Sequence, residues 1–473
     1  MRTAEARDWS YNGRVSGDAI ELNEAAEPDS VDDPGDDVVD DVDDPGDDYV
    51  DVLDDGEPRI LERSEHAVSR KGISASAVKV LYRLHRAGHR GYLVGGGVRD
   101  LMLGRQPKDF DIGTDARPAE IRRLFRNARI IGRRFRLAHI IFHDGVVEVA
   151  TFRRAPDPED QRGGPEAMLI TSDNTFGTPR EDAFRRDFTI NALFYSIADF
   201  TVIDYVGGID DLRAKLVRVI GDPDVRFRED PVRMMRACEF AGRLGFTIEK
   251  ATQEGIERNR EELRKAAPPR MTEELLQLLK SGRAGSSVQW MLELGVLEVL
   301  LPEALAMVRA AELGAGELGN VLPVLDAMAQ EEEEVPDQVL MAAVLLPQVM
   351  LERYQREVKR QRWLDPGEFR KVVLATVEPF FERFAVPNLK KIQMVQALEG
   401  FHRLCEGDFS RNQRLRFAAK SYFDDALWLF ELLVRATGEG HPELEQWKAA
   451  ARQGRRREPR PEVRRPRPRR RRR

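Results

Sequence analysis

Residues Leu93 to Thr114 read LVGGGVRDLMLGRQPKDFDIGT, which places a glycine triplet shortly before an Asp-x-Asp pair. In an extended strand, side chains at positions i and i+2 point the same way. Asp109 and Asp111 are therefore expected to project together, with Phe110 turned into the core. Two carboxylates on one face repel each other unless a cation lies between them. Oxygen ligands suit Mg²⁺, which fills its remaining positions with water and substrate phosphates.

The glycine triplet itself predicts a phosphate cradle. Gly95, Gly96 and Gly97 follow an apolar stretch, Tyr92–Val94, that is typical of a strand, and they precede a helical stretch, Val98–Leu103. Glycines at such a turn let backbone N–H groups approach a phosphate at a helix N-terminus. A glycine turn or an Asp-x-Asp pair alone is common in ordinary loops. Together they suggest nucleotidyl or phosphoryl transfer.

Charge is strongly segregated along the 473 residues, a length that suggests two to four domains. Residues 1–58 carry a net charge of −18 and residues 452–473 a net charge of +11, so the part between them is neutral. The acidic tail is expected to be a solvating segment; the alternative is that it folds onto a basic surface when RNA is absent. The 13 arginines of the basic tail, interrupted by prolines, are expected to bind phosphates without sequence preference.

Cysteine and hydropathy patterns favour a cytoplasmic protein. Only Cys238 and Cys405 occur, which excludes a disulfide framework, and the seven histidines and two cysteines show no zinc-ligand spacing. The N-terminus is polar and acidic, unlike a signal peptide. The longest apolar run, near Val339–Leu346, is too short to span a bilayer.

The pattern of elements changes along the chain. Residues 1–65 are expected to be a disordered acidic tail, and residues 66–200 an α/β domain whose Ala155–Asp182 segment is a long flexible loop. After about residue 201, apolar residues at i, i+3 and i+4 predict helices. Order is expected to fade in residues 441–473.

A second constellation, RRDFTINA, follows the flexible loop and looks like the entry to a helix. Arg185 and Arg186 suit a triphosphate, because a guanidinium donates bidentately to phosphate oxygens. Asp187 has three readings: it binds a ribose hydroxyl, it holds an arginine, or it is a third carboxylate near the metals. Glu148 competes for the last role, as a base for a 3′-hydroxyl if its strand lies beside the Asp-x-Asp strand. The alternative for Glu148 is a buried ion pair with Arg153 or Arg154.

A third element reads EDPVRMMR. Pro231 fits the first position of a helix, which makes Asp230 a natural N-cap. Asp230, Arg233 and Arg236 follow one another at intervals of three, so they share a helix face. A carboxylate acceptor and guanidinium donors together could read the edge of a nucleobase.

At this point the sequence resembles the class II nucleotidyltransferases that extend RNA 3′ ends, namely bacterial poly(A) polymerases and tRNA CCA-adding enzymes. The resemblance runs from about Tyr92 to Leu300 through GGGVRD with DFD, RRDFTINAL, DYVGGIDDL (Asp204–Leu212) and EDPVR. It implies an α/β nucleotidyltransferase head of the polymerase-β type over 66–200. A helical neck over 201–275, a helical RNA-binding body and tail over 276–440, and disordered termini are expected to accompany it.

The resemblance also assigns roles to residues. Asp109 and Asp111 would bind two catalytic Mg²⁺ ions, and Asp187 would belong to the active site. Residues expected at the nucleotide are Gly95, Gly96, Arg99, Asp100, Arg185, Arg186, Asn191, Asp230, Arg233 and Arg236. The sequence departs from the family's usual pattern at Gly97, where Ala is common, and at Glu239, where Arg is common.

The segment IIGRRFRLAHI (Ile130–Ile140) is similar to the one that marks poly(A) polymerases. The expected function is therefore template-independent addition of AMP from ATP to RNA 3′ ends, with release of pyrophosphate. RNA 3′ ends and the RNA-decay machinery are the expected partners, with no membrane association. CCA addition is the nearest alternative, and a catalytically silent RNA-binding protein is a remote one.

Overall fold

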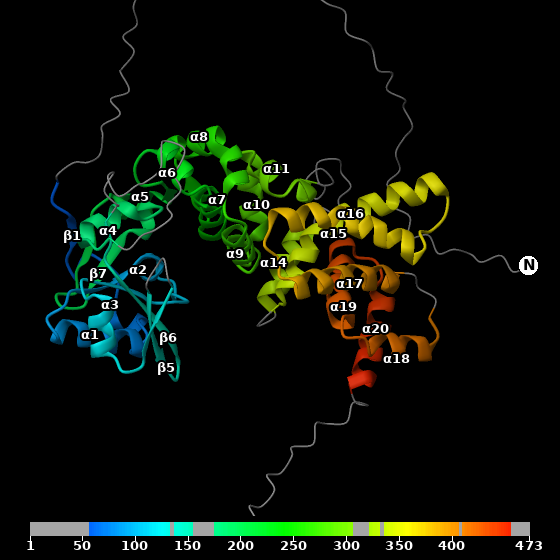
Figure 1. Cartoon of the computed structure of the whole chain (residues 1–473), viewed down its shortest axis with the longest axis horizontal. Helices are drawn as coiled ribbons and strands as arrows, with labels where there is room; N and C mark the ends of the chain where they lie inside the picture. The colour runs from blue at the N-terminus through cyan, green and yellow to red at the C-terminus, as the bar shows by residue number, and fades with distance from the viewer. Residues whose placement is uncertain are drawn as a thin grey trace, which may run out of the picture. The chain divides into compact units, whose positions relative to one another are not determined.

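The structure is a computed structural model. It describes residues 56–132, 137–154, 175–305, 321–331, 335–405 and 409–455 (Figure 1). The expectations for the acidic segment before residue 56, for the loop from 155 to 174 and for the basic tail after 455 lie outside the described residues. Most of the poly(A)-type marker, residues 130–140, is described, but its centre is not.

An eight-stranded sheet organises the first part of the described chain, as expected for an α/β head. Neighbouring strands pair antiparallel, except for β3 and β6, which run parallel. In spatial order the strands are β1 (Arg59–Leu61), β8 (Val202–Asp204), β7 (Leu193–Ser196), β2 (Gly91–Val94), β3 (Asp111–Thr114), β6 (Gly145–Thr151), β5 (Leu137–Phe142) and β4 (Ala128–Ile131).

One face of the sheet packs against helices, and the other carries acidic side chains. Helices α1 (Ala75–Arg86) and α3 (Pro118–Leu124) pack on one face, where Ile112, Val149 and Ile140 join the main hydrophobic core. Because side chains alternate along a strand, Asp111 and Glu148 point to the other face. The sheet therefore holds the carboxylates away from the helices that cover its core.

Two expectations for this region are wrong. The chain is already ordered before residue 65, because β1 pairs with β8 and buries Leu61. The RRDFTINAL stretch does not enter a long helix. It links helix α4 (Pro179–Arg185) through a single 3-10 turn, η3 (Thr189–Asn191), to the central strand β7. The apolar run Leu193–Ser196 is buried on both sides, which favours a strand over an amphipathic helix.

The DYVGGIDDL motif packs against η3. The Asp204 carboxylate accepts hydrogen bonds from the backbone N–H groups of Val206, Gly208 and Ile209, which fixes the turn that starts helix α5 (Gly208–Ala214). A Cβ on Gly208 would lie only 2.2 Å from the carbonyl oxygen of Thr189. Glycine is therefore required for α5 to approach η3 this closely.

Helices dominate the chain after β8, as the apolar periodicity predicts. A short parallel pair, β9 (Leu216–Val217) with β10 (Thr247–Ile248), interrupts them. The first group comprises α6 (Pro223–Glu229), α7 (Val232–Leu244), α8 (Lys250–Asn259), α9 (Pro268–Leu279), α10 (Ala284–Glu293) and α11 (Val296–Leu300), with 3-10 turns η4 (Arg260–Lys265) and η5 (Pro302–Ala304). The second group comprises α14 (Val321–Glu331), α15 (Asp337–Arg360), α16 (Pro366–Arg383), α17 (Asn388–Cys405), α18 (Arg411–Ala418), α19 (Phe423–Thr437) and α20 (His441–Arg455).

Helix α20 corrects the expectation that residues 441–473 are a disordered tail. Leu444, Trp447 and Ala451 recur at helical spacing and are buried in the core of the last helices. The Arg-rich composition begins only after this amphipathic stretch. Among the described helices, none combines the length and apolar character of a membrane span.

Replacing Trp447 by Ala tests whether α20 is part of the folded core. The Trp447 ring lies against Phe409, Phe417 and Phe423, with centroids 5.4 to 6.0 Å apart, and is only 2% exposed. Its loss should lower the free energy of unfolding by about 3–5 kcal/mol. Denaturant unfolding checks this, with the exposed Glu445→Ala as the control. Equal stability of the two variants would show that α20 is dispensable for the fold.

Candidate active site

The site begins at a glycine with a positive φ angle. Between β2 and helix α2 (Gly96–Met102), Gly95 has φ +68° and ψ −134°, a conformation that residues with a Cβ rarely adopt. Its N–H donates to the carbonyl of Leu193 on β7 (3.1 Å). A Cβ at this position would lie 2.9 Å from Nη1 of Arg186. The glycine turn therefore brings the backbone against the second expected constellation, RRDFTINA.

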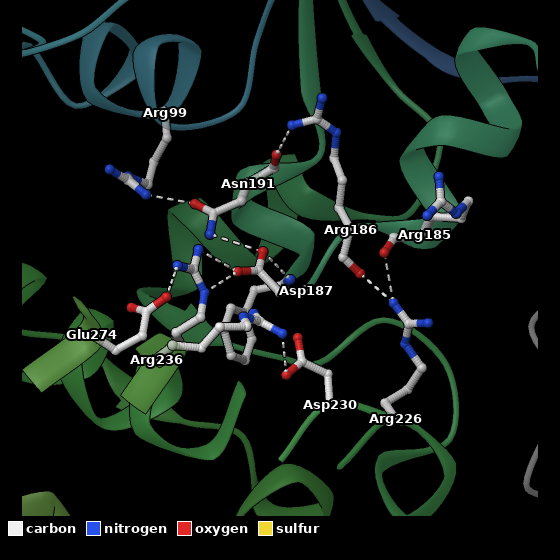
Figure 2. A network of polar contacts seen from close by, with 11 residues as sticks. Arg99, Arg185, Arg186, Asp187, Asn191, Arg226, Asp230, Arg236 and Glu274 are labelled. Carbon is white, nitrogen blue, oxygen red and sulfur yellow. Dashed lines mark hydrogen bonds and ion pairs between the residues drawn. The ribbon is translucent and has the colours of Figure 1, made fainter. Parts of the chain in front are cut away.

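Arg99 points into the protein from α2 (Figure 2). It is only 3% exposed, its Nη1 donates to Oδ1 of Asn191 (2.5 Å), and its Nε donates to Asp100 (2.8 Å). Burial, partly offset by the Asp100 carboxylate, lowers the pKa of Arg99 below the usual value for arginine. Arg99 thus ties the GGGVRD helix to η3 and positions Asn191.

The acidic residues meet on the open face of the sheet. In the parallel β3–β6 register, Asp111 lies directly beside Glu148, and Asp109 is close enough to act electrostatically on Asp111. Glu148 is 46% exposed, and its carboxylate contacts His139 Nε2 on β5 (3.2 Å). The alternative expectation of a buried ion pair for Glu148 is therefore wrong. Of the two candidates for a third carboxylate, Glu148 is the one beside the Asp-x-Asp pair.

This crowding changes the acidity of Asp111. Asp111 is exposed at the start of β3, where the next three residues are buried. Partial burial first, and then the negative charges of Glu148 and Asp109, raise the pKa of Asp111 to about 6, while Arg186 opposes the rise. The site thus contains negative charge that a bound cation would neutralise.

Arg185 and Arg186 line a small cavity of about 210 Å³ with Arg153 and Asp182. Its other walls come from β5 and β6, on the face that also carries Glu148. Arg186 is held by Asp182 (3.0 Å) and donates through Nη1 to the Asn191 carbonyl (3.1 Å). Three arginines around a hollow beside carboxylates make a place for an anionic group.

Asp187 is buried in a network rather than directed at the Asp-x-Asp pair. Its Oδ2 accepts from Nε of Arg236 (2.8 Å), and its Oδ1 accepts from Nδ2 of Asn191 (3.1 Å). Arg236 also donates to Glu274 on α9 (2.9 Å). Burial acts to raise the pKa of Asp187, but the Arg236 guanidinium and these hydrogen bonds outweigh it, so the pKa lies below its usual value. Of the three readings for Asp187, the structure supports the one in which it holds an arginine.

Arg226 on α6 donates hydrogen bonds to the backbone of the RRD turn (Figure 2). Its Nη2 donates to the carbonyl oxygens of both Arg185 (2.8 Å) and Arg186 (2.6 Å), and its Nη1 donates to Glu229 (2.8 Å). Arg233, only 6% exposed, donates to the Arg226 carbonyl (2.9 Å). The EDPVR segment therefore supports the peptide units of the two arginines that line the cavity.

Asp230 does not cap helix α7 with its side chain. It ends α6, and α7 begins one residue later than expected, with Pro231 at the N-cap position. The Oδ1 of Asp230 instead accepts from Nη1 of Arg270 on α9 (2.8 Å). Asp230, Arg233 and Arg236 are each held by a partner of their own and not by one another.

The supporting residues Arg226, Arg270 and Glu274 were missed at the sequence level. Arg270 and Glu274 are four residues apart on α9, which places both on one face of that helix. This pattern is ordinary for a solvated ion pair, and only the packing of α9 beside α7 shows that they pair with Asp230 and Arg236 instead. At the departure noted at Glu239, the carboxylate accepts a hydrogen bond from Arg243 within α7.

Among the described residues, no group of three or more His, Cys, Asp or Glu side chains has an arrangement that would itself hold a metal ion. The chemistry of Asp109 and Asp111 nevertheless fits Mg²⁺, which commonly uses one or two protein carboxylates and completes its shell with water and phosphate oxygens. The placement of Asp111 directly beside Glu148 in the β3–β6 register, with Asp109 two residues away, is the observation that favours a cation there.

Comparison with known proteins finds family models that resemble two segments of this chain. Residues 91–218 match the family model described as the poly A polymerase head domain. Residues 245–307 match a model described as a probable RNA and SrmB-binding site of polymerase A. Both models cover segments in which the structure has the expected nucleotidyltransferase head and the following helices.

Individual relatives agree with these models. Poly(A) polymerase I of Salmonella typhi is 51% identical over 248 residues, covering 51% of this chain and 53% of that protein. The CCA-adding enzyme of Bacillus velezensis is 39% identical over 224 residues, covering 47% of this chain and 55% of that enzyme. The chain thus spans about half the length of the curated relatives it matches.

A solved structure supports the fold over a longer stretch. The crystal structure of the Bacillus stearothermophilus CCA-adding enzyme in complex with CTP superposes with a TM-score of 0.57 at 24% identity, covering 80% of this chain and 82% of that chain. At this identity the match supports the fold alone: an α/β nucleotidyltransferase head followed by helices.

Two neighbouring glycines provide a matched test of the turn. Gly95→Ala should lower the free energy of unfolding by about 1–3 kcal/mol, because a Cβ meets Arg186 and the backbone conformation favours glycine. Gly97→Ala should be neutral or stabilising by up to about 1 kcal/mol, because its Cβ would meet the Asp109 carbonyl at an ordinary 3.5 Å inside a helix. Thermal unfolding of both variants checks this, and similar losses in the two would contradict the role given to Gly95.

The raised pKa of Asp111 predicts a pH-dependent effect of Asp111→Asn on the metal-free protein. At pH below about 3 the carboxyl is protonated in both folded and unfolded states, so the variant should match the parent. Above about pH 6 the parent holds an unfavourable charge, and the variant should be more stable by about 1 kcal/mol, a value reduced by solvent screening. Unfolding in the presence of a chelator measures this; a pH-independent difference would be the contrary result.

Proposed function

We propose that the chain is a member of the class II tRNA nucleotidyltransferase and poly(A) polymerase family and that it is a template-independent poly(A) polymerase. In the proposed reaction, AMP passes from ATP to an RNA 3′ end and pyrophosphate is released. The observation that carries the proposal is the group formed by Asp109, Asp111 and Glu148 next to an arginine-lined cavity. The 51% identity to a poly(A) polymerase, against 39% to a CCA-adding enzyme, favours adenylate addition.

The chemical step is a substitution at the α-phosphorus of ATP. The RNA 3′-oxygen forms a bond to that phosphorus while the bond to the bridging oxygen breaks, and pyrophosphate leaves. The proton of the 3′-hydroxyl passes to a base, and Glu148 is the proposed acceptor because its partly exposed carboxylate lies beside Asp111. Its contact with His139 keeps this carboxylate oriented.

Asp109 and Asp111 are the proposed ligands of two Mg²⁺ ions. When bound, these ions supply charge neutralisation at the transferring phosphate and align attacker and leaving group. The protein contributes two adjacent carboxylates whose mutual repulsion disfavours the ion-free state. Arg186, which already acts electrostatically on Asp111, lies where it would offset charge on the departing phosphates.

Recognition of ATP is assigned to the surrounding residues. Gly95 and Gly96 would offer backbone N–H groups to phosphate, and Arg185 and Arg186 would bind the triphosphate. Asn191, held by Arg99 and Asp187, would meet the ribose from η3. Four residues would act indirectly by holding the nucleotide-binding side chains in place: Arg99, Asp100, Asp187 and Arg236.

The adenine edge is assigned to Asp230 and Arg233. Arg270 engages Oδ1 of Asp230, so Oδ2 is the oxygen proposed to accept from the adenine amino group. Arg233 is fixed by the Arg226 carbonyl and by Glu229, which gives its guanidinium a defined orientation. Specificity in this proposal comes from a preorganised acceptor and donor rather than from a nucleic-acid template.

Further assignments belong to the same proposal. The boundaries expected from the sequence, a head over 66–200, a neck over 201–275 and a body with tail over 276–440, are extended so that the head includes β1 and β8 and the tail includes α20. The neck, body and tail are proposed to bind RNA. The biological setting is polyadenylation of RNA in the cytoplasm, leading to RNA processing and decay, with RNA-decay proteins as partners. The basic segment after residue 455 would tether RNA by its charge.

Incubation with a generic RNA and with a tRNA lacking its CCA end tests the reaction. Long adenylate tails should form on both from ATP and Mg²⁺, and the chelated reaction should give none. Asp109→Asn should reduce incorporation by about 10³-fold or more, because the cation loses a ligand at the transferring phosphate. The matched control is Asp115→Asn, a head carboxylate outside this group.

Three other outcomes would identify the alternatives. Completion of CCA that needs CTP and then stops would show a CCA-adding enzyme. RNA binding without incorporation of any nucleotide would show a silent RNA-binding protein. Full activity of Asp109→Asn would remove the carboxylate pair from the mechanism.

A further inference from the structure

A second and larger cavity lies on the back of the head sheet. It has a volume of about 500 Å³ and is bounded by one flank of α1, by the connection from α3 to β4 and by the end of β5. Phe142 lines it and follows Ile140 by two positions on β5, so both face the side of the sheet that α1 covers. Asp111 and Glu148 point to the opposite side. The back-face pocket is therefore separate from the site described above.

The back-face pocket is basic. Lys79, Arg83 and Arg86 line it from successive turns of α1, and no acidic side chain is among its lining residues. Within the described part of the chain, no ion pair involves any of these three cations. The neighbouring Asp144, at the β5–β6 turn, accepts a hydrogen bond from the hydroxyl of Ser76 (2.9 Å) and is close enough for Lys79 to act on it electrostatically, without a direct ion pair. The three charges are thus available to an anion from outside.

Aromatic side chains form the rest of the pocket. Phe125 is buried at its base, and the guanidinium of Arg83 lies 5.3 Å from the centre of the Phe125 ring. Tyr82 accepts a hydrogen bond from Arg70 through its hydroxyl (2.7 Å), which fixes the position of its ring. Phe142 is half-buried and presents its ring from β5. Cations next to aromatic rings are the combination with which proteins hold single-stranded nucleic acids.

We propose that the back-face pocket binds one nucleotide unit of a single-stranded RNA. The base would stack on the aromatic rings, and its phosphates would meet Lys79, Arg83 and Arg86. The volume is in the range of pockets that take small organic ligands, which includes a nucleotide. The proposal rests on the proposed function, since that function supplies RNA and single-stranded adenylate tails to the protein.

The composition of the pocket favours RNA over other anions. An acidic peptide would satisfy the three cations but would leave the aromatic rings without a planar partner. The location of the pocket favours an RNA strand over free ATP. A site behind the sheet holds RNA without competing for the cavity that Arg185 and Arg186 line.

The test is a binding measurement on the full chain without ATP or Mg²⁺. A fluorescently labelled oligoadenylate is titrated by anisotropy at several salt concentrations. Arg83→Ala with Arg86→Ala should weaken binding about tenfold and reduce the slope of log K against log salt by about 1.4, because two phosphate contacts are lost. The matched control, Arg122→Ala with Arg123→Ala, removes two exposed arginines from α3 and should keep the parent affinity and slope.

A third variant tests the stacking. Phe142→Leu keeps the charge and an apolar side chain but removes one ring, and it should weaken oligoadenylate binding about fivefold or more. Ultraviolet crosslinking of the bound oligoadenylate, followed by peptide mapping, should label peptides that contain Tyr82 or Phe142. Thermal unfolding of every variant identifies any loss that comes from misfolding.

Several outcomes would overturn the proposal. Equal losses in the α1 and α3 double variants would mean general charge attraction. Binding of a poly-aspartate peptide that depends on Arg83 and Arg86, with RNA binding unaffected, would make this a protein-docking site. Displacement of the oligoadenylate by ATP at this site would make it a free-nucleotide site. None of these binding measurements requires catalysis. Failure to incorporate AMP would therefore overturn the proposed function, and the binding result at the back-face pocket could still be interpreted.

Discussion

The partly buried ion pair between Asp187 and Arg236 is the contact on which the arrangement of the site depends. It joins the turn after α4 to helix α7, and through Glu274 it extends to α9. Removing one member of a buried pair typically costs about 3–5 kcal/mol, and the partial exposure of Arg236 makes the cost here smaller. Because Asn191 shares the Asp187 carboxylate, the same pair also links α7 and α9 to η3.

A second constraint acts on the peptide backbone of Arg185 and Arg186. Arg226 gives both carbonyl groups a charged donor, while its Nε has no hydrogen-bond partner among the described residues. Burial and the nearby Arg233 lower the pKa of Arg226 to about 10. The guanidinium remains charged at neutral pH, so α6 and the end of α4 are held as one unit in spite of their separation along the chain.

The sequence was sufficient for the features that depend on local pattern. The strand before Gly95 and the glycine turn follow from periodicity and glycine chemistry. The closeness of Asp111 to Glu148 depends on the pairing of β3 with β6, which the sequence left open. What it could not supply is the choice among partners for charged residues. From the sequence, Asp230 could equally cap a helix or pair with Arg270. Asp187 could equally bind a metal ion or pair with Arg236. Likewise, Arg-rich composition concealed the amphipathic pattern around Trp447, which packing made visible.

The order of strands in the sheet has a consequence for biosynthesis. Strand β1, made early, lies at the edge of the sheet and pairs with β8, which is separated from it by the rest of the head. While the chain emerges from the ribosome, the Arg59–Leu61 segment has to remain unpaired until Val202–Asp204 is available. Such non-local pairing makes folding slow relative to helix formation. The helices after β8 thus begin to emerge at about the time when the sheet can first close.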